Sequence, residues 1–308
     1  KMVQNGEKSI EWEKLRKTVR KAVHFLDNVI DASRFPLFEI EKMVKANRKI
    51  GLGVMGFADM LIQMGVPYDS EEALKLAEEV MCFIEDEAVK ISVELAEIRV
   101  SFPNFKGSVW EKRGFDKIRN ATLTSIAPTG TISIIAGCSS GIEPLFSVSF
   151  VRNVLGGARL IEVNPFFEKI AKERGFYSSE LMVKIAKKGS IQDMEEIPAD
   201  VRRLFVTSLD IAPEWHVKMQ AAFQKYVDNA VSKTVNLPHD ATLEDVKKAF
   251  LLAYELNCKG ITVYRYGSKK KQVLYIGDLS GKEKGETLEY ISVNEEYAGG
   301  CPTGECIY

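Results

Sequence analysis

The chain has 308 residues, a formal net charge of −1 and 45% hydrophobic residues, a composition typical of a folded domain with a substantial core. The balanced charge argues against a nucleic-acid polymer as partner, and no apolar run approaches the roughly 18–20 residues of a membrane span. Five cysteines are too few and odd in number for a secreted disulfide scaffold, so we expect a reducing cytoplasm.

The first third of the chain is predicted to be helical. Apolar residues at helical spacing predict an amphipathic helix over 11–31, and a second helix follows over 36–48. Asp69 and Glu72 indicate a capping box for a helix that runs to about residue 98.

Three glycines lie between these helices, at positions 51, 53 and 56. Their spacing is similar to that of a dinucleotide-binding loop, but no strand clearly precedes them. We therefore interpret them as sites of close helix packing or of a strand–helix turn rather than as a phosphate loop.

The segment 122–146, TLTSIAPTGTISIIAGCSSGIEPLF, carries most of the candidate chemistry. We expect a strand-like apolar run to meet a turn at Pro-Thr-Gly-Thr and a second strand to follow it. Glycines and hydroxyl residues at the end of a buried strand let N–H groups and hydroxyls converge on an anion. A hydroxyl-rich turn without a ligand is the structural alternative.

The second half of the chain alternates helices and strands. We expect helices over 165–174, 179–188, 198–205 and 213–231. A strand over 233–237, a helix over 246–257 and a strand over 260–264 then form a βαβ unit, so these two strands should be parallel. The alternation indicates an α/β fold. From residue 269 the chain is rich in Lys, Glu and Gly, which predicts a flexible tail.

Ordered motifs across the chain resemble the C-terminal half of ribonucleotide reductase catalytic chains, most closely the adenosylcobalamin-dependent (class II) branch. They are Asn120–Ser133 with Ser140–Pro144, Arg48–Asp59, Asp228–Pro238 and Lys259–Ser268. The resemblance implies that residues 1–268 form the C-terminal half of a ten-stranded α/β barrel. It also implies a flexible redox tail over 269–308.

The same resemblance implies site residues. Pro128, Thr129, Gly130, Thr131 and Ile132 should bind the diphosphate of a ribonucleoside diphosphate substrate. Glycine lets the backbone approach an anion closely, and charge-assisted hydrogen bonds are worth roughly 1.5–3 kcal/mol each.

Cys301 and Cys306 resemble the family's tail pair, which carries reducing equivalents from a thioredoxin- or glutaredoxin-type reductant into the active site. Half of a zinc site and an incidental pair are the alternatives. We expect no metal site in this chain.

The expected cofactor is adenosylcobalamin. The iron-dependent branch relays a radical through two adjacent tyrosines, whereas here Arg265 separates Tyr264 from Tyr266. A radical made locally from cobalamin needs no such relay. The histidines, which we interpret as surface or core residues and not as cobalt ligands, are His24, His216 and His239.

The family's Asn-x-Cys-x-Glu radical loop does not occur in this sequence, and Cys138 is interpreted as a packing residue. Because the sequence starts at Lys1, we expect it to be part of a longer polypeptide whose missing N-terminal part supplies the radical cysteine. The implied activity is thiyl-radical reduction of ribonucleoside diphosphates to 2′-deoxyribonucleotides for DNA synthesis, in a possible family-like homodimer. The alternatives are the large subunit of an iron- or manganese-dependent (class I) reductase and a non-catalytic nucleotide-binding module.

Overall fold

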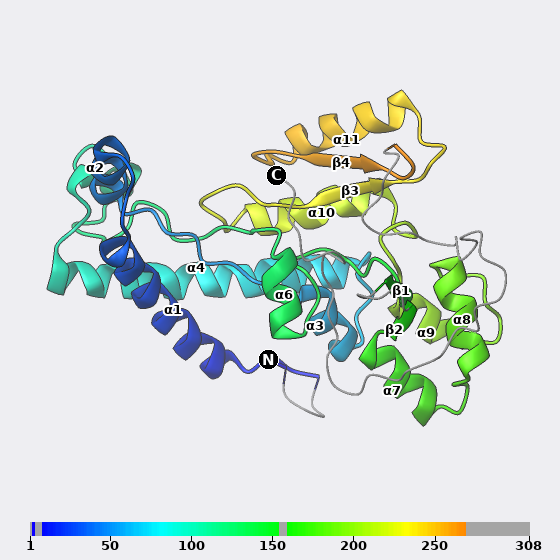
Figure 1. The fold of residues 1–308 in the computed structure, drawn as a ribbon. Coiled ribbons are helices and arrows are strands. Elements are labelled where there is room, and N and C mark those ends of the chain that lie inside the picture. The colour runs from blue at the N-terminus through cyan, green and yellow to red at the C-terminus, as the bar shows by residue number, and fades with distance from the viewer. Residues whose placement is uncertain (1, 4–7, 154–158, 269–308) are drawn as a thin grey trace.

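The computed structural model describes residues 2–3, 8–153 and 159–268 (Figure 1). Its helices are α1 (Trp12–Ala32), α2 (Phe38–Asn47), α3 (Phe57–Met64), α4 (Glu71–Arg99), the short 3₁₀ helix η1 (Pro103–Phe105), α5 (Val109–Lys112), α6 (Gly130–Ala136), α7 (Pro165–Glu173), α8 (Ser179–Lys188), α9 (Ala199–Leu204), α10 (Pro213–Gln224) and α11 (Leu243–Glu255). Its strands are β1 (Ser149–Asn153), β2 (Arg159–Val163), β3 (Thr234–Leu237) and β4 (Thr262–Arg265). The predicted tail, with Cys301 and Cys306, lies outside the described residues.

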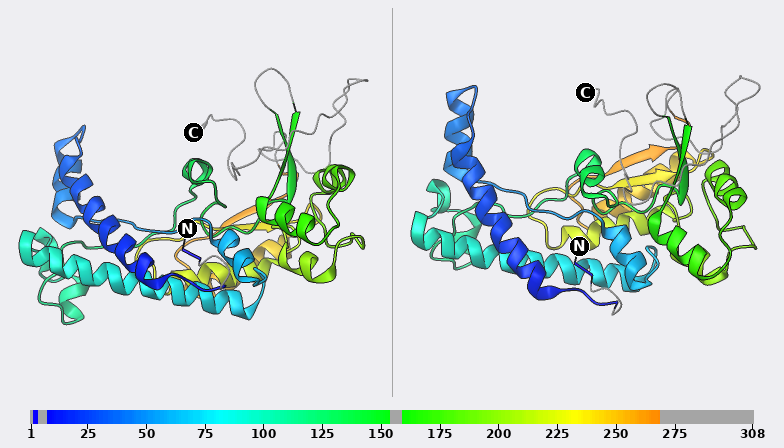
Figure 2. Two further views of the ribbon diagram at one scale, coloured as in Figure 1. Left: turned by 90° about the horizontal axis from the view of Figure 1, so that it is seen from below. Right: turned by 60° about the horizontal axis from the view of Figure 1, so that its bottom comes forward.

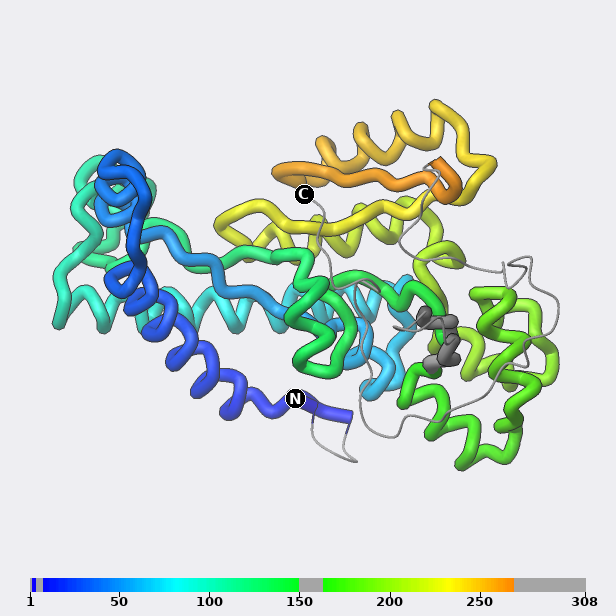
Figure 3. Tube along the Cα trace, viewed as in Figure 1, coloured from blue at the N-terminus to red at the C-terminus, as the bar shows by residue number. Residues whose placement is uncertain are grey.

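Extended segments from distant parts of the chain lie side by side and parallel, as Figure 3 shows in blue, green, yellow and orange. The parallel pairs are Leu52 with Thr124, Ile126 with Val231, and β3 with β4. The segments 50–52, 122–126, 229–237 and 262–265 therefore form one parallel wall. This wall agrees with the predicted α/β architecture, and β3, α11 and β4 form the predicted parallel βαβ unit.

Helices cover this wall. The long helix α4 packs on α1 and α10, and α10 packs on α11 and β3. Fully buried alanines at positions 73, 77 and 88 of α4 let neighbouring helices approach closely. Figure 2 shows that α6 and the β1–β2 hairpin project to the same side of the molecule. No helix among the described residues is long and apolar enough to cross a membrane.

A buried charge cluster ties the start of the wall to α1. The Asp27 carboxylate is fully buried and accepts hydrogen bonds from Arg48 at 2.8 and 2.9 Å, from Arg119 at 3.2 Å and from Asn120 at 3.1 Å. Burial alone would raise the pKa of Asp27, but the hydrogen bonds and charges of Arg48 and Arg119 outweigh it and lower the pKa. Asp27 is therefore held ionised between two segments of the wall.

The glycines at 51 and 53 serve close packing, but against an extended segment and not against a helix, and Gly56 forms the predicted turn into a helix. A Cβ at Gly53 would lie 2.0 Å from the Ser125 carbonyl oxygen, a distance that no side chain tolerates. Gly56 has a φ of 76° and precedes α3. Glycine at 53 therefore allows the segment 50–54 to lie against the segment 122–126.

The prediction of a second strand after residue 129 was wrong. The run Thr131–Ile135, in which four of five residues are β-branched, forms helix α6, because Thr129 takes a left-handed conformation and turns the chain out of the wall. Helix α10 also ends earlier than predicted, since the following residues pair with the wall through Asn229 N–H and the Thr124 carbonyl at 3.1 Å. The β1–β2 hairpin was not predicted.

The start of α4 differs in one residue from the expected capping box. Ser70 is the N-cap, and its hydroxyl oxygen accepts the Ala73 N–H at 3.1 Å. This is an ordinary serine cap, so the helix itself was predicted at its true position.

Candidate functional site

The extended segment 122–126 leads into a helix N-terminus that its N-cap residue, Thr129, does not cap. After Pro128, Thr129 adopts a φ of 57°, and α6 then begins at Gly130. The first N–H groups of a helix, here those of Gly130, Thr131 and Ile132, have no acceptor within the helix. The Thr129 side chain does not cap them. An anion at this end would be held by backbone N–H groups and favoured by the helix dipole.

Thr129 instead links the turn at 128–131 to the loop at 137–141. Its Oγ1 accepts the Gly141 N–H at 2.6 Å. Gly141 needs to be glycine, because its φ is 46° and a Cβ there would lie 3.0 Å from the Ala127 carbonyl oxygen. The loop at 137–141 therefore fixes the residue that turns the chain into α6.

The entrance to α6 is open. Pro128, Thr131 and Ile132 are exposed, and Ile132 keeps 53% of its surface accessible. A Cβ on Gly130 would meet nothing within 4 Å. The packing of the described residues therefore does not require glycine at 130. The open space beside its backbone can admit a ligand.

Helix α3 holds the second loop in place. The Ser139 N–H donates to Asp59 Oδ2 at 2.7 Å, and the Asp59 N–H donates to Ser139 Oγ at 3.3 Å. The Gly56 N–H donates to the Ser139 carbonyl at 2.7 Å. Cys138 lies directly against Gly56, since an added Cβ there would be 3.2 Å from Cys138 Cβ. This contact agrees with the interpretation of Cys138 as a packing residue.

A buried charged network lies next to this loop, and the sequence analysis did not identify it. The Lys233 ammonium, whose side chain is 0% exposed, donates to Glu143 Oε2 at 2.6 Å, to His216 Nδ1 at 2.8 Å and to the Thr234 carbonyl at 2.5 Å. Glu143 Oε1 accepts the Thr234 N–H at 2.7 Å. Glu143 lies in the Ile-Glu-Pro motif and Lys233 in the Ser-Lys-Thr motif, but their sequence separation gave no sign that they meet.

His216 is neutral in this network. Burial, followed by the neighbouring Lys233 charge, lowers the pKa of His216 to about 3. Its Nε2–H then donates to the Ser208 carbonyl at 3.0 Å, which leaves Nδ1 to accept from Lys233. Burial also lowers the pKa of Lys233, while Glu143 opposes that shift.

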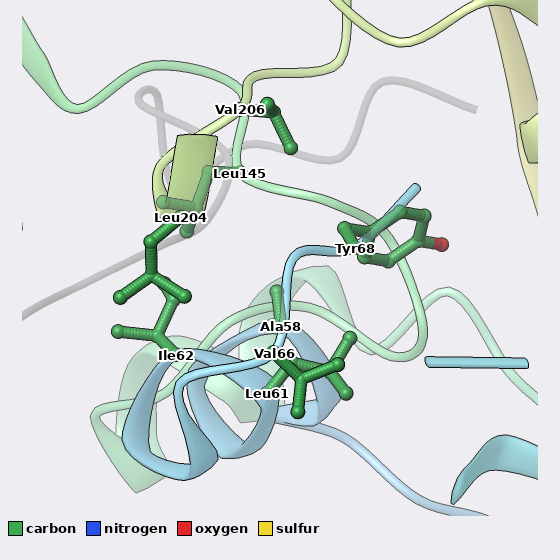
Figure 4. A pocket seen from close by; sticks show the side chains of 8 residues that line it. All are labelled: Ala58, Leu61, Ile62, Val66, Tyr68, Leu145, Leu204 and Val206. Carbon is green, nitrogen blue, oxygen red and sulfur yellow. The ribbon is translucent and has the colours of Figure 1, made fainter. Parts of the chain in front are cut away.

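An apolar pocket between α3 and α9 is a different feature (Figure 4). Its lining residues are Ala58, Leu61, Ile62, Val66, Tyr68, Leu145, Leu204 and Val206. The Tyr68 hydroxyl, the one polar side-chain atom in this lining, donates to the Ile142 carbonyl at 2.5 Å. The pocket therefore offers a nucleotide no further polar side chain and is not our candidate site.

The other predicted residues are spread out. Tyr264 lies on β4 with Tyr266 just beyond it, both half-buried, and Arg265 between them is exposed. His239 is exposed and His24 lies beside Arg99. No group of three or more His, Cys, Asp or Glu residues in the described ranges could hold a metal ion.

The chain matches the family model "Ribonucleotide reductase, barrel domain" over residues 1–118 and 116–264. It belongs to the ribonucleotide reductase family. The family and fold inferred from the motifs are thereby confirmed.

Two curated relatives and one solved structure place the chain within this family. It is 52% identical to a vitamin B12-dependent ribonucleoside-diphosphate reductase of Thermoplasma acidophilum, over 99% of this chain and 41% of that protein. It is 47% identical to the Mycobacterium tuberculosis (strain CDC 1551) protein of the same name, over 96% of this chain and 42% of that protein. The Actinobacillus ureae class Id ribonucleotide reductase alpha subunit superposes with a TM-score of 0.70 at 26% identity, over 82% of this chain and 46% of that chain. The chain thus spans about two fifths of the length of the curated relatives.

Proposed function

We propose that this chain forms the substrate-phosphate side of the active site in an adenosylcobalamin-dependent ribonucleoside-diphosphate reductase. The observation that carries the proposal is the uncapped start of α6, where Thr129 bonds to Gly141 instead of capping the helix. The names of the relatives at 47–52% identity supply the substrate class and the cofactor.

The chain's own contribution is binding and orientation. The N–H groups of Gly130, Thr131 and Ile132 hold the diphosphate, and Pro128 leads the chain to them. The exposed Thr131 hydroxyl adds a donor. Thr129 also keeps a hydroxyl proton to donate while its oxygen accepts from Gly141. Holding the phosphates fixes the ribose relative to the reacting groups, which lowers the entropic part of the barrier.

Adenosylcobalamin supplies the chemistry of radical generation when it is bound. Tyr264 and Tyr266 are separated by an exposed arginine and do not form the adjacent pair of the iron-dependent branch. We assign no cobalamin contact to a residue of this chain, and the radical cysteine lies outside it, because its motif does not occur in the sequence.

The test is turnover by the complete reductase that carries this chain, with a ribonucleoside diphosphate and reduced thioredoxin. We expect deoxyribonucleotide only when adenosylcobalamin is added, and with no second radical-generating protein. A requirement for such a protein would establish the class I alternative. Nucleotide binding without any turnover would establish the non-catalytic module.

The redox role of the tail is a separate proposal, since Cys301 and Cys306 lie outside the described residues. Thiol–disulfide exchange needs an accessible thiol and a second thiol that resolves the mixed disulfide. Cys301→Ser should abolish multiple turnover with thioredoxin and leave nucleotide binding unchanged. Cys258→Ser is the matched control, because burial raises the pKa of the Cys258 thiol and makes it a poor nucleophile. Full thioredoxin-driven turnover by Cys301→Ser would refute the shuttle.

A further inference from the structure

We propose that Lys233 is a positioning residue for the phosphate loop, here residues 128–132, and that it acts on this loop through Glu143. The inference rests on the proposed function, since it assumes that the loop binds the substrate diphosphate. Lys233 is a buried cation that contacts Glu143, His216 and Thr234 and none of the residues proposed to bind phosphate.

One route from Lys233 reaches the end of the loop. Lys233 binds the carboxylate of Glu143, and Glu143 follows Gly141 by two residues. The Gly141 N–H in turn donates to Thr129 Oγ1 at 2.6 Å, at the residue that turns the chain into α6. The Glu143 N–H also donates to the Ser140 carbonyl at 3.0 Å, so the carboxylate belongs to the same tight loop.

A second route reaches the beginning of the loop. Ser232, the residue before Lys233, donates its N–H to the Ile126 carbonyl at 2.9 Å. Ile126 is two residues before Pro128. The segment 232–234 therefore holds both ends of the loop. Ser232 binds Ile126 before the loop, and Lys233 and Thr234 bind Glu143 after it.

The geometry of Lys233 is fully determined. Its three ammonium protons have three acceptors, on Glu143, His216 and Thr234. A buried ammonium that moved would lose at least one of these bonds without water to replace it. His216 is fixed from its other side by the Ser208 carbonyl. The ammonium thus provides a rigid anchor for the loop.

The anchor also controls a charge that a diphosphate would meet. The Glu143 side chain is 26% exposed, so an unpaired carboxylate there could turn toward solvent and repel a phosphate. Lys233 neutralises this carboxylate and keeps it directed at Thr234, where Oε1 accepts the N–H at 2.7 Å. Loss of Lys233 should therefore weaken binding of the phosphates and not of the nucleoside.

The test compares Lys233→Met with the unchanged protein in the complete reductase, at a temperature where circular dichroism shows both folded. We measure dissociation constants for a ribonucleoside diphosphate and for the matching nucleoside without phosphates. We expect the diphosphate constant to rise roughly ten- to a hundredfold, the scale of one weakened charge-assisted hydrogen bond to the phosphates. The nucleoside constant should stay within about twofold, as for an independent site.

Further variants decide between outcomes. Glu143→Gln keeps the side-chain shape but removes the carboxylate charge, so it tests the anchor without the repulsion. The same ratio should rise in this variant too, by less than in Lys233→Met, and this result stands alone if Lys233→Met does not fold. Phe167→Leu, in the core at α7, controls for lost stability and should leave the ratio unchanged. Gly130→Ala reports on the phosphate loop itself.

A loss of diphosphate affinity in Gly130→Ala alone would overturn the positioning role and leave the proposed function intact. No loss in Gly130→Ala, Lys233→Met or Glu143→Gln would overturn the phosphate assignment itself. Equal losses for diphosphate and nucleoside in the Lys233 and Glu143 variants would show a general disruption, and would also overturn the positioning role.

Discussion

Replacing Gly130 with alanine should affect ligand affinity and protein stability differently. A Cβ at this position would meet nothing within 4 Å. Gly130 is the first residue of α6, and its φ does not lie in the left-handed region. Alanine reduces the freedom of the unfolded chain, so the free energy of unfolding should stay constant or rise by about 0.4–1 kcal/mol. Under the proposed function, we expect the methyl group to crowd a diphosphate held by the neighbouring backbone N–H groups.

The expected loss of affinity follows from the bonds at stake. One charge-assisted hydrogen bond is worth roughly 1.5–3 kcal/mol, which corresponds to a dissociation constant about 10- to 150-fold higher. The assay pairs calorimetric binding of a ribonucleoside diphosphate to the complete reductase with thermal unfolding of the same samples. We expect weaker binding at an equal or higher melting temperature.

Two glycines serve as controls. At Gly260 a Cβ would also meet nothing within 4 Å, so Gly260→Ala should keep or slightly raise stability, as at Gly130, and leave binding unchanged. At Gly53 a Cβ would lie 2.0 Å from a carbonyl oxygen, so Gly53→Ala should destabilise the fold. Unchanged affinity in Gly130→Ala would refute phosphate binding by the backbone N–H groups at the start of α6. A loss of stability in Gly130→Ala as large as that in Gly53→Ala would refute the inference that the fold leaves room for a side chain at 130.

Further predictions concern the supports of the site. Thr129→Val leaves the Gly141 N–H without its acceptor and should cost about 1–3 kcal/mol in chemical unfolding, whereas Thr129→Ser keeps the hydroxyl and should cost clearly less; equal losses would contradict this. His216 has a pKa of about 3 in the folded protein against about 6.5 when unfolded, so the unfolded state binds more protons between these values. Stability should therefore fall as pH falls through that window, by up to about 1.4 kcal/mol per pH unit, and urea titrations of His216→Gln should show a shallower slope. Asp27→Asn leaves buried arginines without their carboxylate and should cost about 3–5 kcal/mol; a cost below about 1 kcal/mol, the value of a surface pair, would contradict the cluster's role. The pKa of Asp27 is lowered in the folded protein, so its contribution to stability should be present above about pH 4 and lost as acid protonates it. Below about pH 4, the stability of Asp27→Asn should therefore depend less on pH than that of the unchanged protein.

Local sequence determined most of the helices and the βαβ unit. Helices α1 and α8 and the unit β3–α11–β4 lie within a few residues of their predicted bounds. Their signals are short-range: apolar residues at helical spacing, Ser178 and Thr242 as N-caps, and β-branched strands. The motif around Pro128 likewise pointed to the family, which the barrel-domain match confirmed.

Tertiary structure decided the form of the site. The run Thr131–Ile135 has the β-branched composition of a strand, yet it is helical because Thr129 is held in a left-handed conformation by Gly141, twelve residues away. Glu143 and Lys233 are 90 residues apart and meet only because the loop after α6 packs against the start of β3. Short-range propensity fixes helices and turns, whereas a buried cation finds its acceptors only after distant segments have packed, and no local pattern encodes that packing.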